Sequence, residues 1–239
     1  MTMKYVGVDG CRAGWFAVII EENRVSCSLY ATFTSLWAAH DTAACIMVDI
    51  PIGLPDCAPY VRHADSLARK RLGGRGASIF TPGVREVLDA PDYPVACEVN
   101  RQLTGKMISK QFWNIVPKIK DVDCVVQANP SCREVVRESH PELCFSLAAG
   151  RELIHGKKSP EGIEERLAVI RSRHPGVHTL YEKALNSYYR KDVARDDIPD
   201  AMILAVTAWS SAGSLRSYPS PPQYDSRNVP MAIWYHEFS

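Results

Sequence analysis

Hydrophobic residues in the first part of the chain gather in short apolar runs that are typical of β-strands. Residues 5–8 form an apolar run that ends at Asp9, and residues 15–20 form a second run rich in β-forming side chains. Gly10 and Gly14 bracket the short segment between the two runs. This pattern predicts a β-hairpin with Asp9 near the end of its first strand.

The following segments extend this unit to residue 49. Residues 25–31 alternate loosely like a third strand, residues 32–39 fit a short helix, and residues 44–48 form an apolar run that ends at Asp49. Pro51 and Pro55 come next, and neither has the N–H that a central strand needs. A loop is therefore expected after Asp49, which places this second aspartate at a strand end as well.

The middle of the chain changes to a helical pattern. Residues 60–72 predict a helix, residues 73–76 a flexible glycine-rich loop, and residues 94–128 mostly helix with a break at Pro117. Residues 133–138 predict a further short strand, which His140 and Pro141 close. Glu138 thus becomes a third acidic residue at the end of an apolar segment.

Helices dominate the last third of the chain. Ser159, Pro160 and Glu161 form a strong helix start, because Ser caps, Pro tolerates the first turn and Glu complements the positive helix end. Residues 174–176 end that helix, and residues 198–212 are apolar nearly all round, which predicts burial against a sheet. A proline-rich stretch at 219–222 leads to residues 231–235, a candidate edge strand.

Composition narrows the class of protein. With 239 residues, 46% of them hydrophobic and 23% charged, the chain is typical of a globular domain that folds without disulfides. No two of its eight cysteines lie closer than eight residues, so no CxxC motif is present. The N-terminus has no secretory leader, and the longest apolar stretch, residues 201–209, is about half of the ~20 residues that span a membrane. We therefore expect a cytoplasmic protein with free thiols.

Charge is distributed unevenly along the chain. The net charge of +1 excludes a protein that coats nucleic acid. However, residues 61–90 carry +3 and residues 151–191 carry +4, which leaves −6 for the remainder. These two segments supply candidate contacts to a phosphate backbone, with a solvated helix face as the ordinary alternative: Arg69, Lys70, Arg71, Arg75, Lys157 and Lys158.

Five carboxylates are the candidate catalytic residues, each at the end of an apolar segment: Asp9, Asp49, Glu138, Asp197 and Asp200. Strand ends at one edge of an α/β sheet form the usual ligand crevice, so these side chains are expected to converge there. Converging carboxylates repel one another unless cations lie between them, and Mg²⁺ and Mn²⁺ prefer carboxylate oxygens. The four aspartates are therefore candidate ligands of two such ions, which together can hydrolyse a phosphodiester.

Structural roles for the same residues stay open. Asp197 and Asp200 fit a helix cap, and Asp9 before Gly10 fits the start of a turn. Glu138 has two neighbours, His140 and Glu142, that could be the functional group in its place.

Six segments carry a resemblance to a known family: VGVDGCRAGW at 6–15, VDIPIGLP at 48–55, SIFTP at 78–82, ESHPE at 138–142, KKSPEG at 157–162 and DDIPDA at 196–201. In this order they are similar to the domain-of-unknown-function family numbered 429. Its members are described as predicted ribonuclease H-like nucleases.

The resemblance implies a single ribonuclease H-like domain over residues 1–239. This α/β fold has a central mixed five-stranded sheet, its second strand antiparallel, flanked by helices, and here an inserted, mostly helical cap at roughly 56–128. By analogy with Holliday-junction resolvases, Asp9 resembles the first-strand aspartate, Asp197 and Asp200 resemble the pair that opens the last helix, and Asp49 stands where those enzymes usually have Glu. The expected activity is that of a metal-dependent nuclease acting on DNA or RNA.

Two other classes of function remain as alternatives. Residues 9–14 also resemble the first phosphate loop of actin-like and sugar-kinase ATPases, although the chain has no room for the second domain of those proteins. A non-catalytic binding module, with its acids serving as caps and turns, is the third possibility.

Overall fold

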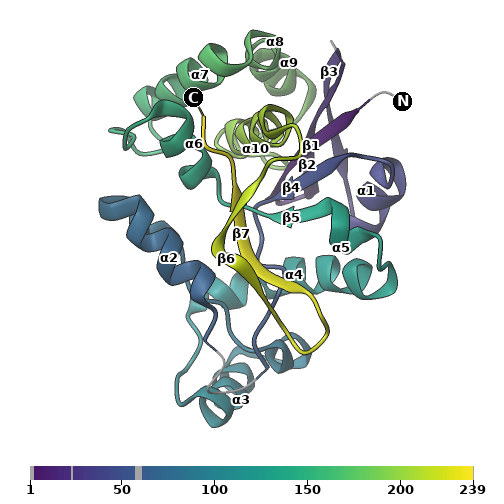
Figure 1. Ribbon diagram of the computed structural model, residues 1–239, viewed down its shortest axis with the longest axis vertical. Helices are drawn as coiled ribbons and strands as arrows, with labels where there is room; N and C mark the ends of the chain where they lie inside the picture. Colours follow the sequence, from purple (N-terminus) through teal and green to yellow (C-terminus); the bar gives the residue numbers. More distant parts are fainter. Residues whose placement is uncertain (1–2, 23, 57–60, 239) are drawn as a thin grey trace.

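The computed structural model describes residues 3–22, 24–56 and 61–238. Its centre is a five-stranded sheet in the order β3-β2-β1-β4-β5 (Figure 1). The strands are β1 (Lys4–Cys11), β2 (Gly14–Glu21), β3 (Arg24–Tyr30), β4 (Cys45–Val48) and β5 (Val136–Glu138). Cys57 and residue 60 of the predicted helix lie outside the described residues.

The direction of the strands confirms the predicted topology. β2 is antiparallel to both β1 and β3, whereas β4 is parallel to β1 and to β5. The register places Val8 beside Val48 and Val48 beside Glu138. Because parallel strands end at the same edge of a sheet, the residues that follow these positions lie together at that edge.

Helices cover both faces of the sheet, as Figure 1 shows. One face packs against α1 (Phe33–His40), η2 (Arg85–Asp89), α3 (Tyr93–Thr104) and α4 (Lys110–Ala128). The other packs against α6 (Pro141–Ala149), α7 (Pro160–Arg173), α8 (Pro175–His178), α9 (Leu180–Ser187) and α10 (Asp197–Ser211). Alternate residues of β2 serve the two cores, with Trp15 and Ala17 on the first side and Phe16 and Val18 on the second. Double burial explains why β1, β2 and β4 are apolar almost throughout.

The last helix, α10, approaches the central strand closely. A Cβ on Gly7 would lie 2.1 Å from the backbone N of Ala205 and 2.2 Å from the carbonyl O of Ala201. Glycine is therefore required at this position of β1 for the helix to pack where it does. The close packing fixes the first turn of α10 beside the end of β1.

The C-terminal segment differs from the prediction. The proline-rich stretch belongs to a strand, β6 (Arg216–Tyr224), and it pairs with β7 (Pro230–Tyr235) in a separate two-stranded sheet. The pairing is irregular between Tyr218 and Gln223, where the prolines fall, so their missing N–H groups are tolerated. Residues 231–235 do form a strand, although not an edge strand of the main sheet. This hairpin packs on α2 (His63–Leu72), with Ala64 and Ile233 in one small core.

Three local predictions are wrong. The break in the long helical segment falls at Gly105 rather than Pro117, because Gly105 adopts the left-handed conformation (φ 78°) while α4 runs through the proline with its ring side exposed. Residues 73–78 form a 3₁₀ helix, η1 (Gly73–Ser78), instead of a flexible loop. The strand predicted at 133–138 is shorter, since its first part forms the helical turn α5 (Cys132–Val135).

Two expectations about the whole chain are met within the described residues. The cysteines described by the structure are all free thiols. In the same ranges, no helix combines the length and the hydropathy that a membrane span requires.

Candidate active site

Three elements bring the predicted aspartates to one place. Asp9 lies in β1, one residue after Val8, on the side of the sheet that α10 covers. Asp49 directly follows β4, and its backbone N–H donates to the Val8 carbonyl at 3.1 Å, which extends the parallel ladder by one step. Asp197 and Asp200 lie in the first turn of α10. The convergence of these four residues thus follows from strand register and from the close packing of the helix on Gly7.

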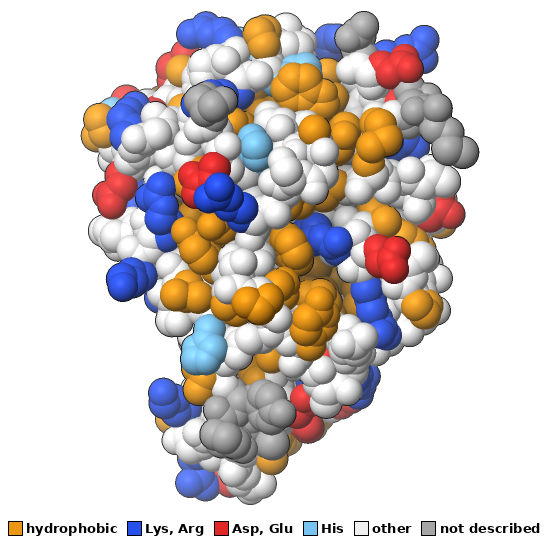
Figure 2. Space-filling view, in the orientation of Figure 1, with side chains coloured by type: hydrophobic (Ala, Val, Ile, Leu, Met, Phe, Trp, Pro, Cys, Tyr) orange, Lys and Arg blue, Asp and Glu red, His pale blue; other side chains and the backbone are white. Residues whose placement is uncertain are grey.

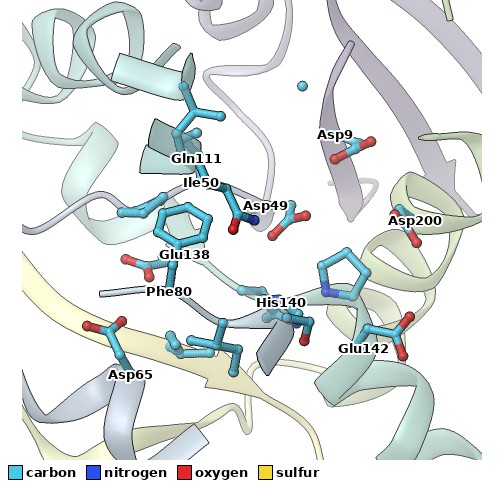
Figure 3. A pocket seen from close by; sticks show the side chains of 18 of the residues that line it. Asp9, Asp49, Ile50, Asp65, Phe80, Gln111, Glu138, His140, Glu142 and Asp200 are labelled. Carbon is cyan, nitrogen blue, oxygen red and sulfur yellow. The ribbon is translucent and has the colours of Figure 1, made fainter. Parts of the chain in front are cut away.

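The four aspartates line one cleft of about 600 Å³. Figure 3 shows the carboxylates of Asp9, Asp49 and Asp200 around a common open space. A volume of this size is typical of small-molecule sites. The cleft also contains Glu138, Glu142 and Lys157 among its lining residues.

Lys157 supplies positive charge inside this acidic cluster. Its Nζ donates to Asp200 Oδ2 at 2.6 Å and lies 3.7 Å from Asp196 Oδ2. The other oxygen of Asp200, Oδ1, is buried and has no hydrogen-bond partner among the described residues. Burial acts to lower the pKa of Lys157, but the negative charges of Asp200 and Asp9 outweigh it and raise that pKa above its ordinary value.

The carboxylates are short of positive charge despite this lysine. Burial, together with the nearby charges of Asp200 and Asp49, raises the pKa of Asp9 well above its usual range. Burial also raises the pKa of Asp49 to about 6 and that of Asp200 to about 6, although Lys157 pulls both down. The pKa of Asp197 rises to about 6 for the same primary reason. Perturbed acids gathered in a cleft are a mark of functional sites.

The acids do not form a ready-made metal cage. Within the described ranges, no three His, Cys, Asp or Glu side chains stand in an arrangement that could hold an ion. Lys157 already occupies one oxygen of Asp200, at 2.6 Å. The chemistry of the donor set nevertheless suits Mg²⁺ or Mn²⁺, since carboxylate oxygens converge there and Asp200 Oδ1 is unsatisfied.

The possible capping roles of the aspartates were a further alternative. Asp197 Oδ2 accepts a hydrogen bond from the backbone N–H of Ala194 at 2.8 Å, so this side chain does stabilise the turn that precedes α10. The Asp200 side chain accepts from Lys157 instead and caps nothing among the described residues. Asp200 is therefore oriented by the cleft rather than by its own helix.

Glu138 has a different environment from the aspartates. Its Oε2 accepts from the Ile52 N–H at 2.9 Å, and its Oε1 forms an ion pair with the buried guanidinium of Arg62. Arg62 also contacts Asp65 at 2.7 Å. Both oxygens of Glu138 are thus engaged, and the hydrogen bond between Oε2 and the Ile52 N–H holds the loop that starts at Asp49.

Its two neighbours, Glu142 and His140, are less fully engaged. Glu142 pairs through Oε1 with the buried Arg166, while its Oε2 has no hydrogen bond within the described part of the chain and lies 3.7 Å from Arg75. His140 Nδ1 is also buried without a partner there, and burial lowers the pKa of this imidazole. If a further group assists the aspartates, these two have atoms available and Glu138 does not.

The basic candidates separate into two groups. Arg75 and Lys157 line the cleft, whereas Arg69, Lys70, Arg71 and Lys158 are not among its described lining residues. Arg69 donates to the Ile79 carbonyl at 2.7 Å and to Thr81 Oγ1 at 2.9 Å, so it holds the loop on either side of Phe80. Figure 2 shows Lys and Arg scattered over the face of the hairpin, around a central band of hydrophobic side chains.

Lining residues that sequence reasoning did not select include Phe80, Gln111 and Lys118. Lys118 donates to the Gly14 carbonyl and lies 4.6 Å from the Trp15 ring centroid. Lys118 and Gln111 come from α4, which joins the sheet far from the acids in sequence. The SIFTP segment at 78–82 did carry part of the family resemblance, and this was the available signal for Phe80.

The fold and the site together define a class of protein. A mixed five-stranded sheet in this order, flanked by helices and with acids at its strand ends, is an α/β architecture consistent with a ribonuclease H-like fold. The family model described as "Protein of unknown function (DUF429)" matches residues 7–224, and the chain belongs to that family. No curated protein and no solved structure matches the chain. Because the family description states no activity, the nuclease stays a prediction.

Proposed function

We propose that this protein is a metal-dependent nuclease. The observation that carries the proposal is the meeting of Asp9, Asp49 and Asp200, from three separate elements, in one cleft. Their pKa values lie above the ordinary range because they are buried together. A buried cluster that is short of positive charge favours a divalent cation.

Asp9, Asp49, Asp197 and Asp200 would hold the Mg²⁺ or Mn²⁺ ions, with two ions expected. Bound there, such ions activate a water and stabilise the oxygen that leaves the phosphorus. Lys157 would release Asp200 when the ions bind, because ammonium and metal compete for the same carboxylate. The side chain of Lys157 is 38% exposed, so it can move to solvent or to a substrate phosphate.

The remaining polar groups would position these parts. Glu138 holds the Ile52 N–H and thereby the loop after Asp49. Arg75 donates to the carbonyl groups of Leu153 and His155 at 2.7 and 2.8 Å, which ties η1 to the segment that carries Lys157. DNA or RNA is the proposed substrate, since the cations of the cleft suit a phosphodiester.

The activity test compares three proteins on labelled single-stranded and duplex DNA and RNA, each with Mg²⁺ or Mn²⁺. The wild type should cleave, and Asp9→Asn should cut the rate at least about 100-fold, as loss of a transition-state interaction of roughly 3 kcal/mol implies. Asp89→Asn is the matched control, because its carboxylate is 82% exposed and pairs with Lys120 outside the cleft. Equal rates for wild type and Asp9→Asn would refute the proposal.

A metal titration tests the same site without catalysis. Mn²⁺ should raise the melting temperature of the wild type and of Asp89→Asn, because a ligand that binds only the folded state stabilises it. Asp49→Asn should lose that increase. An undiminished increase in Asp49→Asn would place the metal elsewhere.

A further inference from the structure

The cleft continues beyond the carboxylates into an apolar end that the metal chemistry does not use. Its walls include Ile50, Ile79, Phe80, Ile115 and Ile233. Phe80 is only partly buried and its ring centroid lies 6.3 Å from that of Phe112, which supports it from behind. The charged groups nearby, Arg62, Asp65 and Glu138, are paired with one another, so Phe80 presents an aromatic face beside the aspartates.

Gln111 stands where the two ends meet. It belongs to the first turn of α4, is exposed, and makes no hydrogen bond that the described residues provide. In Figure 3 its amide extends toward Asp49, next to the Phe80 ring. A side-chain amide offers one acceptor and two donors, which is the pattern that reads the edge of a nucleobase.

The wall that carries Phe80 is held rigidly. Arg69 binds the residues on both sides of Phe80, through the Ile79 carbonyl and the Thr81 hydroxyl. The Ile79 N–H also donates to the Gly76 carbonyl at 3.1 Å. Arg69 is therefore a positioning residue for the aromatic wall, and the fold places Phe80 at a fixed angle to the cleft.

We propose that this cleft binds one unpaired nucleotide, with its base against Phe80 and beside the Gln111 amide and its phosphate at the aspartates. This rests on the proposed function and specifies its substrate as nucleic acid with a splayed or single-stranded nucleotide. Bases stack on aromatic side chains only when they leave the duplex, and enzymes that enclose a base do so in a pocket of this kind. The cleft volume of about 600 Å³ fits one nucleotide rather than a continuous duplex.

The test is equilibrium binding by fluorescence anisotropy, with Ca²⁺ in place of Mg²⁺ to slow cleavage. The probes are a short labelled DNA strand, its RNA counterpart, the blunt duplex, and a strand of equal length made of abasic sites. Wild type should bind the base-bearing strands several-fold more tightly than the duplex or the abasic strand. Phe80→Ala should weaken binding of the base-bearing strands about 5- to 100-fold, and leave the abasic strand unchanged.

Control variants separate stacking from folding. Phe80→Trp keeps an aromatic face and should retain the preference for bases. Gln111→Ala, an exposed change on α4, should reduce that preference even if Phe80→Ala proves unstable. Tyr189→Ala removes an aromatic side chain that is 75% exposed outside the cleft, and should alter nothing.

Equal binding of base-bearing and abasic strands, or of duplex and single strand, would overturn the inference. A mononucleotide that competes with the strand supports it, because the pocket then recognises a single nucleotide unit. If no strand is cleaved with Mg²⁺ or Mn²⁺ while base-dependent binding persists, the proposed nuclease fails and the base pocket stands. If cleavage occurs at equal rates with and without bases near the cut, the pocket fails and the nuclease stands.

Discussion

Replacing Lys157 by Met removes the ammonium from the acidic cluster while keeping the length of the side chain. In the folded protein Lys157 Nζ lies 2.6 Å from Asp200 Oδ2, and Asp200 is almost fully buried. Two unit charges 4 Å apart interact by about 4 kcal/mol at an effective dielectric constant of 20. Breaking a fully buried pair costs about 3–5 kcal/mol, whereas an exposed pair contributes about 0–1 kcal/mol.

The side chain of Lys157 is 38% exposed, so solvent screens its charge and an intermediate loss applies. We expect Lys157→Met to lower the free energy of unfolding by about 2 kcal/mol at pH 8 in EDTA. For a chain of 239 residues this corresponds to a fall in melting temperature of about 4–8 °C. Calorimetry in EDTA measures it directly.

The pH dependence identifies the cause of the loss. Asp49 and Asp200 have pKa values of about 6, so at pH 5 they are largely protonated and the ammonium has little charge to balance. The loss at pH 5 should therefore be below about 0.5 kcal/mol. Mn²⁺ at pH 8 should raise the melting temperature of Lys157→Met more than that of wild type, because the competing ammonium is gone.

Lys158→Met is the matched control, since its exposed side chain does not line the cleft in the described structure. It should change stability by less than about 0.5 kcal/mol at either pH. A loss in Lys157→Met that is equal at pH 5 and pH 8 would show that packing, and not charge, is responsible.

Three further predictions concern other parts of the fold. Gly7→Ala should lower the free energy of unfolding by about 3 kcal/mol or more, because its Cβ would lie 2.1 Å from the backbone N of Ala205. Thermal melts measure this loss, and an unchanged melting temperature would contradict the close packing. Wild-type protein in EDTA should lose stability as the pH rises through about 6, because the raised pKa of Asp49 means that folding favours its protonated form. Asp49→Asn should make the stability depend less on pH in this range. Arg85→Met should cost about 3–5 kcal/mol in denaturant titrations, because it leaves the buried carboxylates of Asp123 and Asp225 unpaired; a change as small as that of an exposed arginine would refute this.

The strands β1, β2 and β4 could be predicted from the sequence because their signals are local, whereas the mixed five-stranded topology was expected from the family resemblance. Continuous apolar runs rich in β-forming residues indicated β1 and β2, and the prolines after Asp49 marked the end of β4. The helix start at Ser159 is also confirmed, since the Ser159 hydroxyl accepts from the Gly162 N–H at 3.0 Å. In each case, neighbouring residues alone determine the structure.

The wrong predictions fall where contacts between residues distant in sequence determine the structure. Pro117 does not break α4, because the helix buries Phe112, Val116 and Ile119 against the sheet, and this burial outweighs the ~3 kcal/mol that an internal proline costs. Likewise, β6 accepts its prolines because its pairing with β7 is interrupted between Tyr218 and Gln223, while α2 packs against the hairpin. Long-range packing overrides propensity at these places, and the sequence alone does not reveal it.

The same distinction between local signals and long-range contacts applies to the site residues. Asp9, Asp49 and the α10 pair could be found because acids at the ends of apolar segments are visible in sequence, and the parallel register brings them together. The interpretation of Arg69 depended on charge alone, whereas the structure uses its guanidinium to hold the loop around Phe80. Sequence alone does not show that the Arg69 guanidinium donates to the protein's own Ile79 carbonyl.

This distinction changes how the protein would recognise a nucleic acid. Arg69 is bound to its own chain and Arg75 donates to Leu153 and His155, so these two guanidinium groups would add little to a phosphate track. Selectivity would then come from the two ends of one cleft, with carboxylates for the reacting phosphate and an aromatic wall for its base. Such a site predicts binding that depends only weakly on salt, because few phosphates are neutralised, and strongly on whether a base is available. A steep salt dependence, with a slope that corresponds to many phosphate contacts, would instead favour a surface track and contradict recognition by the cleft.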